Sequence, residues 1–303
     1  MTPILFAMPG NERQAAALAA CLPGQPGDAE IRHFPDGESY VRLLSRVARC
    51  DVMVVCSLND PDTKLVPLLW LAAALTEGGA ARVGLVAPYL AYMRQDAIFR
   101  DGEIVSAHYF AALLGRTFDW LVTIDPHLHR IHNVGEIFPQ PAVVVHAAAA
   151  VASWIRATVP QPLLVGPDEE SRQWVDEIAR LCGADSVVLA KQRLGDRAVT
   201  VKAPDLPAPD GRTPVLVDDV VSTARTMVAS CRLLRQYGYR APVCVGIHAL
   251  FAGTAYAELK AIAAGVATCD TIAHPSNCIA VAQQLAAGIR QALQELPCSG
   301  DRS

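Results

Sequence analysis

Thr213-Pro-Val-Leu-Val-Asp-Asp-Val-Val-Ser-Thr-Ala-Arg-Thr-Met227 is the stretch from which the rest of the chain can be placed. Its apolar run, residues 215–217, is typical of a strand buried on both faces of a parallel sheet. The acidic pair Asp218 and Asp219 follows the run, and a hydroxyl-rich turn and an amphipathic stretch come next. This order predicts a strand, a carboxylate pair, a turn and a helix, which is the repeating unit of open α/β sheets.

The turn after this strand has the chemistry of a ligand site. Ligands of open α/β sheets bind at the carboxyl ends of the strands. A turn that enters a helix offers free N–H groups and a positive dipole end to a phosphate, and adjacent carboxylates suit a diol or magnesium. A plainer interpretation stays open, in which Asp218 and Asp219 lie in an exposed turn and Ser222 or Thr223 is an N-cap. The buried strand before the pair favours the ligand site.

Composition restricts the class of protein. The chain has 303 residues, a formal net charge of −4 and 52% hydrophobic residues, which suits two domains with ample cores. The charge balance gives no support for nucleic-acid binding, and no apolar run reaches the roughly 18 residues of a membrane span. Nine cysteines without a Cys-x-x-Cys pair indicate reduced thiols and a cytoplasmic protein. We therefore expect neither nucleic acid nor a membrane as a partner.

Strand and helix patterns alternate in both halves of the chain. In the first half, strands are predicted at residues 4–7, 31–34, 39–43, 51–56, 82–87, 120–124 and 143–145, and helices at 12–22, 65–75 and 104–114. In the second half, strands are predicted at 163–166, 187–191, 198–202, 215–217 and 244–249, and helices at 147–157, 169–182, 223–237, 254–263 and 278–293. The alternation predicts two tandem α/β domains with doubly wound parallel sheets. Their expected bounds are 1–145 and 146–303, with the last helix a candidate to pack back on the first domain.

Five further segments carry charged, aromatic or histidine side chains that could bind a ligand or take part in catalysis. They are Phe34-Pro-Asp-Gly-Glu38, Pro88-Tyr-Leu-Ala-Tyr-Met-Arg-Gln-Asp96, Ile124-Asp-Pro-His-Leu-His129, Gly166-Pro-Asp-Glu-Glu-Ser171 and Lys191-Gln-Arg193. Taken alone, the first is a hairpin turn by composition, and Arg94 in the second would suit a surface ion pair. Lys191 and Arg193 share one face if that segment is extended. A Gly-x-x-x-x-Gly-Lys phosphate loop is absent from the sequence.

These segments, in this order, resemble ribose-phosphate pyrophosphokinases, which share the motif at 213–227 with type I phosphoribosyltransferases. The resemblance spans nearly the whole chain and implies two domains of phosphoribosyltransferase type. It also implies transfer of the diphosphoryl group of MgATP to O1 of ribose 5-phosphate, which gives phosphoribosyl diphosphate (PRPP) and AMP.

The resemblance assigns roles residue by residue. It implies ATP contacts at Phe34, Asp36, Glu38, Arg94, Gln95 and His127, and magnesium contacts at His127 and Asp168. It implies ribose 5-phosphate contacts at Asp218, Asp219, Ser222, Thr223, Ala224, Arg225 and Thr226. Lys191 and Arg193 match the Lys-x-Arg pair that stabilises the transferring phosphoryl group. The chain departs from the family at Ala224 and Arg225, where glycines are common, and at Glu169 and Glu170, which add negative charge near the pyrophosphate region.

Two rival functions follow from the same residues. A PRPP-consuming phosphoribosyltransferase shares the 213–227 motif but has no need of residues 34–38 or 94–96. A non-catalytic homologue that associates with an active PRPP synthetase is favoured by the departures at Ala224, Arg225, Glu169 and Glu170, whereas Lys191, Arg193 and His127 favour an enzyme. A homo-oligomer is implied by the resemblance alone, because in the family the segment that matches 34–38 reaches a site in a neighbouring subunit.

Overall fold

The computed structural model describes residues 2–128, 130–131, 133–194, 198–202 and 206–296, and within these ranges the side chains of 190–194 and 198–202 are not described. The chain divides into two compact units. Unit 1 runs up to Val145 and also contains the helix that begins at Ala282, and unit 2 is His146–Val281. Each unit is built around its own parallel sheet.

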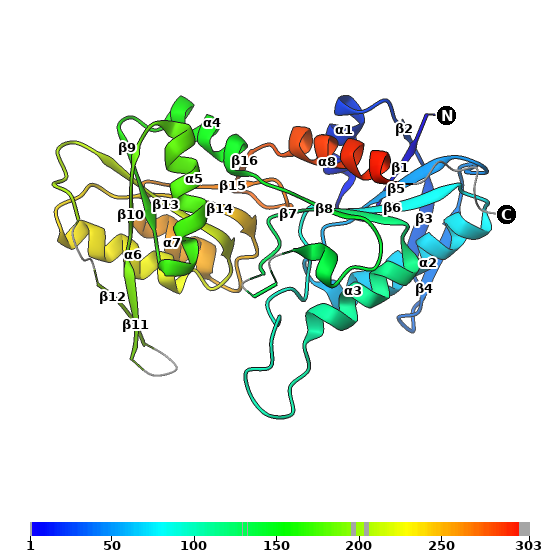
Figure 1. Cartoon of the computed structure of the whole chain (residues 1–303), viewed down its shortest axis with the longest axis horizontal. Helices are drawn as coiled ribbons and strands as arrows, with labels where there is room; N and C mark the ends of the chain where they lie inside the picture. The colour runs from blue at the N-terminus through cyan, green and yellow to red at the C-terminus, as the bar shows by residue number, and fades with distance from the viewer. Residues whose placement is uncertain (1, 129, 132, 195–197, 203–205, 297–303) are drawn as a thin grey trace. The chain divides into compact units, whose positions relative to one another are not determined.

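Unit 1 is a doubly wound sheet, and its six described strands have the order β2-β1-β5-β6-β7-β8. They are β1 (Ile4–Ala7), β2 (Gln25–Pro26), β5 (Asp51–Val55), β6 (Arg82–Ala87), β7 (Trp120–Ile124) and β8 (Ala142–Val145). Helices α1 (Glu12–Cys21) and α8 (Ala282–Glu295) pack together on one face, and α2 (Pro61–Glu77) and α3 (Ser106–Thr117) pack together on the other (Figure 1). An antiparallel hairpin, β3 (Ala29–His33) with β4 (Ser39–Leu43), lies against α2, and a 3₁₀ turn, η1 (Val134–Glu136), precedes β8.

Unit 2 repeats this topology. Its six described strands run β10-β9-β13-β14-β15-β16, all parallel. They are β9 (Pro162–Gly166), β10 (Asp185–Val188), β13 (Thr213–Val221), β14 (Val243–Ala249), β15 (Gly265–Cys269) and β16 (Asn277–Ile279). The helices are α4 (Ala148–Thr158) and α5 (Arg172–Cys182), packed together, and α6 (Arg225–Gln236) and α7 (Ala255–Ile262), packed together. An antiparallel ribbon, β11 (Ala190–Leu194) with β12 (Ala198–Lys202), completes the unit.

The apolar runs of the sequence form the interiors of both sheets. The side chains of β5, β6 and β7 are almost all buried, and Val215–Val217 of β13 are fully buried. One close approach requires glycine: Gly84 of β6 lies opposite Trp120 of β7, and a Cβ atom at Gly84 would lie 1.9 Å from the indole ring. The absence of a side chain at this position therefore makes room for a fully buried tryptophan.

The doubly wound fold and the repetition between halves are confirmed, and several element bounds need correction. β13 does not stop before the acidic pair but continues through Asp218 and Asp219 to Val221. The helix predicted at 278–293 is wrong at its start, because β16 precedes α8 and only α8 is helical. β15 was not predicted at all, and the single strand expected at 187–191 is the end of β10 and the start of β11.

Candidate active site

The acidic pair lies near the carboxyl end of β13, shortly before the chain enters α6. Asp219 is buried, with 7% of its surface exposed, and Asp218 is half-buried. Oδ1 of Asp218 accepts the N–H of Asp219 at 3.1 Å, and Oδ1 of Asp219 accepts the N–H of Val220 at 2.7 Å. Because the strand fixes their backbone, both carboxylates are held in place beside the start of the helix.

The turn from β13 into α6 has a left-handed residue at the helix N-cap. Ala224 has φ 54° and ψ 6°, and its carbonyl accepts the N–H of Val228 at 2.8 Å. Thr223 and Arg225 are exposed, whereas Ser222 and Thr226 are half-buried. The first N–H groups of a helix have no acceptor within the helix and carry the positive end of its dipole. The turn 222–226 therefore offers hydroxyl and N–H donors at one place, which suits a phosphate.

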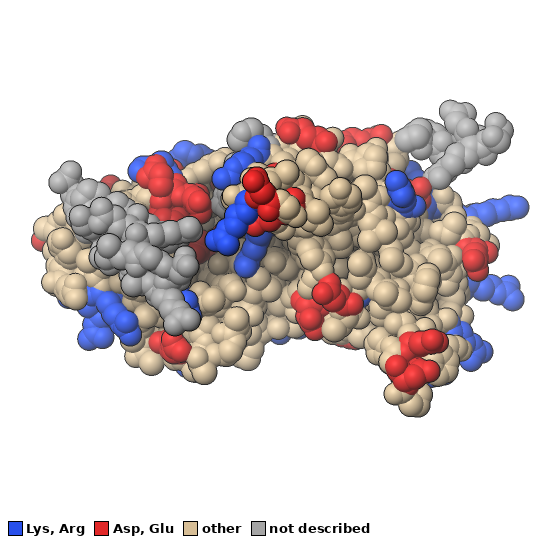
Figure 2. All heavy atoms as spheres, turned by 90° about the horizontal axis from the view of Figure 1, so that it is seen from below, with Lys and Arg blue, Asp and Glu red and all other residues tan. Residues whose placement is uncertain are grey.

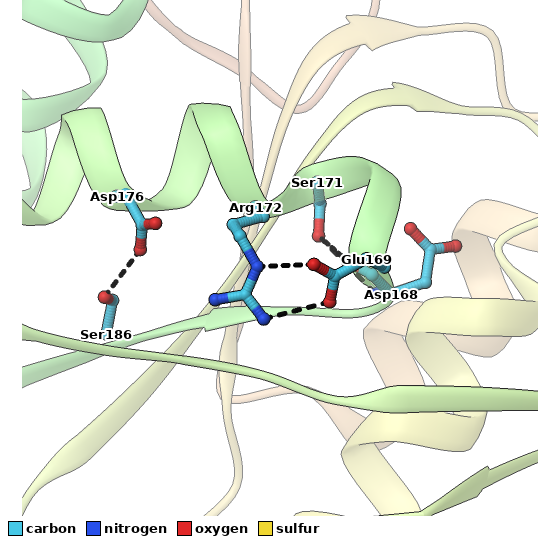
Figure 3. Close-up of polar contacts among 6 residues, drawn as sticks. All are labelled: Asp168, Glu169, Ser171, Arg172, Asp176 and Ser186. Atoms are coloured by element: carbon cyan, nitrogen blue, oxygen red, sulfur yellow. Dashed lines mark hydrogen bonds and ion pairs between the residues drawn. The ribbon is translucent and has the colours of Figure 1, made fainter. Parts of the chain in front are cut away.

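A second acidic loop follows β9, where Asp168 precedes a 3₁₀ turn, η2 (Glu169–Ser171). The hydroxyl of Ser171 donates to the carbonyl of Asp168 at 2.5 Å and closes the loop. Glu169 is paired with Arg172 through two bonds of 2.6 and 2.9 Å, and this hydrogen bonding lowers the pKa of the Glu169 carboxyl. The Asp168 side chain points away from Arg172 (Figure 3). Arg172 therefore offsets one of the two extra negative charges of this loop.

The segment with Lys191 and Arg193 forms one strand of the β11–β12 ribbon. Lys191 lies opposite Val201 and Arg193 opposite Val199 in the antiparallel register. β12 lies against α6, the helix that begins at the 222–226 turn. The side chains of Lys191 and Arg193 lie outside the described part of the structure, so their predicted roles rest on this backbone placement and on the resemblance. His129 and His132 also lie outside the described residues.

In unit 1, the loops after β6 and β7 are tied together. Asp96 is buried and accepts the Arg130 N–H at 2.7 Å and the Arg130 guanidinium at 3.2 Å. This bond holds the loop of Arg94, which is exposed, and Gln95, which is half-buried, beside the loop of His127. Sequence analysis places Asp96 in a motif without a role of its own, because its partner lies 34 residues away. The structure thus brings three of the predicted ATP contacts to one end of the unit 1 sheet.

The remaining predicted ATP contacts lie on the β3–β4 hairpin. The N–H of Phe34 donates to the Glu38 carbonyl at 2.8 Å, and the N–H of Glu38 donates to Asp36 Oδ1 at 3.2 Å. Phe34 is 40% exposed, and Arg32 lies over its ring at 4.8 Å. In Figure 1 the tip of this hairpin and the long loop between β6 and α3 project from unit 1 at separate places. Gly37 and Glu38 share a pocket with Asp62 of α2, and the Tyr92 hydroxyl of the β6–α3 loop donates to that carboxylate.

Five of the eight non-glycine residues with positive φ in the described ranges follow the ends of parallel strands. Asp60, Tyr92 and Asp125 have φ of 53°, 62° and 35°, and they follow β5, β6 and β7 of unit 1. Ala224 and Phe251, at 54° and 30°, follow β13 and β14 of unit 2. Non-glycine residues with positive φ are costly and are concentrated at functional sites. The carboxyl ends of both sheets therefore carry conformations that packing alone does not favour.

The two units have the same kind of turn at corresponding points but different residues in it. β5 and β13 hold the same place in their sheets, and both lead into a helix whose N-cap is left-handed, Asp60 in unit 1 and Ala224 in unit 2. In unit 1 the first helical residue is Pro61, which has no N–H, and the ammonium of Lys64 donates to the Ser57 carbonyl at 2.8 Å. In unit 2 the first helical residue is Arg225, which keeps its N–H, and the turn carries the hydroxyls of Ser222, Thr223 and Thr226.

Surface charge is mixed on the face shown in Figure 2. Lys and Arg side chains alternate there with Asp and Glu side chains, and the described part of that face has no extended basic field. None of the helices in the described ranges combines the length and apolar character needed to cross a bilayer. The eight described cysteines are all free thiols.

Comparison with known proteins covers both units. The N-terminal domain of ribose phosphate pyrophosphokinase matches residues 3–117, and the phosphoribosyl transferase domain matches 133–285. A ribose-phosphate pyrophosphokinase of Methanopyrus kandleri is 33% identical over 94% of this chain and 98% of its own length. One from Pyrococcus abyssi is 31% identical over 81% of this chain and 84% of its own length. The crystal structure of phosphoribosylpyrophosphate synthetase from Mycobacterium smegmatis has a TM-score of 0.83 at 24% identity, covering 98% of this chain and 100% of that one.

Proposed function

The chain belongs to the ribose-phosphate pyrophosphokinase family and is a transferase, and we propose that it makes PRPP and AMP from MgATP and ribose 5-phosphate. The observation that carries this proposal is the β13–α6 element of unit 2. Its buried carboxylate Asp219 and its hydroxyl-rich helix entry lie at the carboxyl end of a parallel strand, where this class of fold binds ligands.

Ribose 5-phosphate has two parts that match this element. We assign the sugar 2- and 3-hydroxyls to Asp218 and Asp219, because ionised carboxylates accept hydrogen bonds strongly. The 5-phosphate is assigned to the turn 222–226, where Ser222, Thr223 and Thr226 supply hydroxyls and the backbone of Ala224 and Arg225 supplies N–H groups. The sugar would then lie at the carboxyl end of β13, with its O1 available to the second substrate.

The reaction requires the oxygen of the sugar to approach in line with the departing AMP oxygen. Positioning and charge neutralisation dominate phosphoryl transfer, and little covalent work falls to the protein. We assign Lys191 and Arg193 to the charge that develops on the transferring group. Their strand pairs with β12, which packs against α6, the helix that begins at the phosphate turn.

ATP binding divides between two kinds of segment. Arg94, Gln95 and His127 lie on loops joined by the Asp96–Arg130 pair, and we assign them to the nucleotide. Phe34, Asp36 and Glu38 on the hairpin would complete the adenine contacts of another copy, as the family resemblance implies for this segment. This assignment makes the working form a homo-oligomer.

Magnesium accompanies ATP in this proposal, with Asp168 and His127 as its protein contacts. No group of three metal-binding side chains occurs among the described residues. Magnesium usually keeps several waters and takes one or two carboxylates together with substrate phosphates. A single carboxylate such as that of Asp168 fits that requirement. The ion would neutralise phosphate charge, while the protein residues orient the two substrates. A cytoplasmic location is proposed from the free thiols.

A coupled assay tests the function directly. Purified chain is mixed with magnesium, ATP and ribose 5-phosphate, and AMP and PRPP are measured together. Equal amounts of the two products are expected, and an Asp219→Asn chain serves as the matched negative control. Release of pyrophosphate from PRPP in the presence of a base would instead identify a phosphoribosyltransferase. Absence of AMP from the chain alone, with stimulation of an active synthetase, would identify a regulatory homologue.

A further inference from the structure

The turn that carries the proposed phosphate site is supported from behind by the loop after β14. The N–H groups of Leu250 and Phe251 both donate to the Val221 carbonyl, at 3.1 and 2.9 Å, and the N–H of Ala252 donates to the Ser222 carbonyl at 3.1 Å. Three successive N–H groups therefore fix the end of β13 and the start of the turn. The position of the turn depends on where residues 250–252 lie.

The loop 250–252 is in turn held by a cluster of three rings. Phe251 has φ 30° and stacks on His274, with ring centroids 4.7 Å apart and planes 29° apart. Tyr256 contacts Phe251 at 5.1 Å and His274 at 4.7 Å, each edge to face. Phe251 also packs against the core that contains Val221 and Ala224. A left-handed phenylalanine is unfavourable by itself, so these ring contacts maintain its conformation.

His274 is the anchored member of the cluster. The Ser276 N–H donates to His274 Nδ1 at 3.2 Å, and the Ser276 hydroxyl lies 2.7 Å from the same atom. That hydroxyl is also 2.8 Å from the hydroxyl of Thr268, which is fully buried in β15. The N–H of His274 donates to Asn277 at 2.8 Å. An Nδ1 that accepts an N–H belongs to a neutral imidazole, and burial lowers the pKa of His274 in agreement.

We propose that His274 is a positioning residue for ribose 5-phosphate, acting through Phe251 on the turn 222–226. This inference rests on the proposed function, since it concerns the same phosphate site. His274 links β15 to the end of β13 through its contacts with Ser276 and Phe251, and it does not itself touch the substrate. The order of contacts is Thr268, Ser276, His274 and Phe251, whose N–H reaches the Val221 carbonyl and whose neighbour Ala252 reaches the Ser222 carbonyl.

Steady-state kinetics of four chains test the proposal. His274→Ala removes the stacked ring, His274→Phe keeps a ring but loses the Ser276 bond, and His108→Ala is a matched control on exposed α3 of unit 1. We expect His274→Ala to raise KM for ribose 5-phosphate about tenfold, which corresponds to about 1.4 kcal/mol, with KM for ATP within about twofold. His274→Phe should recover most of this loss. An equal rise in both KM values, or no rise for ribose 5-phosphate, overturns the proposal.

Amide hydrogen exchange separates this proposal from the function on which it rests. In His274→Ala, exchange at residues 250–252 should become about tenfold faster, while His108→Ala matches the parent. If the parent makes no PRPP, the proposed function fails, and unchanged exchange at 250–252 would then overturn the positioning role as well. If His274→Ala does not fold, Ser276→Ala takes its place. It should accelerate the same amides, and an unchanged rate overturns the proposal.

Discussion

Replacement of Ala224 by glycine tests the geometry of the phosphate turn, because two opposing effects can be weighed. A left-handed backbone costs an L-residue roughly 1–2 kcal/mol, which glycine avoids. Glycine also gives the unfolded chain more freedom, at a cost of about 0.4–1 kcal/mol. Ala224 is 6% exposed, so its lost methyl costs up to about 0.8 kcal/mol more. The relief and the two losses nearly cancel, and we expect Ala224→Gly to change the free energy of unfolding by less than about 1 kcal/mol.

Ala229→Gly is the matched control for this change. Ala229 lies inside α6 and packs against the same hydrophobic core, but its backbone is helical. Glycine there costs about 1 kcal/mol in helix propensity, and no strain is relieved. Urea unfolding of the three chains, followed by circular dichroism at pH 7.5, should therefore show Ala224→Gly as the more stable variant, by about 1 kcal/mol if its relief and losses cancel.

The reasoning is refuted if the two glycine variants are equally destabilised, because Ala224 would then carry no strain. The kinetic counterpart is that Ala224→Gly should leave KM for ribose 5-phosphate unchanged or lower, since it only uncovers N–H groups of the turn. A rise of tenfold or more in that constant would show that the Ala224 methyl itself shapes the site.

Four further outcomes are expected. Lys191→Ala should lower kcat by ~10²–10³ with little change in either KM, the usual effect of losing one contact to developing charge; a kcat within about twofold of the parent would remove Lys191 from the mechanism. Asp219→Asn should weaken ribose 5-phosphate much more than ATP in calorimetric titrations, and equal weakening would contradict its assignment to the sugar. Arg225→Gly should leave KM for ribose 5-phosphate nearly unchanged at two ionic strengths, because exposed Arg225 is a spectator; a large, salt-sensitive rise would show a phosphate contact. Burial lowers the pKa of His274, so its contribution to stability is fully present above the unfolded pKa of about 6.5 and is lost as the pH falls below that value. The urea midpoint should therefore fall less between pH 7.5 and 5.5 in His274→Phe than in the parent. Identical falls would show that His274 is not a source of the loss of stability at low pH.

The sequence predicted the elements that have strong apolar runs and missed those that do not. β5, β6, β7 and β13 were all located from such runs, because parallel strands are buried on both faces. β15, Gly265-Val-Ala-Thr-Cys269, contains a glycine and an alanine that do not favour strands, and its pattern gave no signal. The predicted helix 278–293 includes most of β16, because a short apolar segment does not distinguish the helical period of 3.6 residues from the strand period of 2.

The candidate site was predictable where its residues are contiguous and not where they meet through the fold. The turn 222–226 and the start of α6 followed from local chemistry, and the helix was placed within two residues of its observed start. The left-handed conformation of Ala224 could not be read from an alanine, since that residue is ordinarily right-handed. The Asp96–Arg130 pair and the stack of Phe251 on His274 join loops that are far apart in the sequence.

Helix α8 gives the chain a constraint on its synthesis. Leu285 and Ile289 of α8 are buried in unit 1, and Gly288 lies so close to Val145 and Val122 that an added Cβ would meet their methyl groups at 2.6 and 3.0 Å. A ribosome must translate all of unit 2 between β8 and this helix. At the usual 5–20 residues per second that takes on the order of ten seconds. During that interval part of the apolar face of the unit 1 sheet stays uncovered, and unit 1 cannot complete its core until unit 2 has been made.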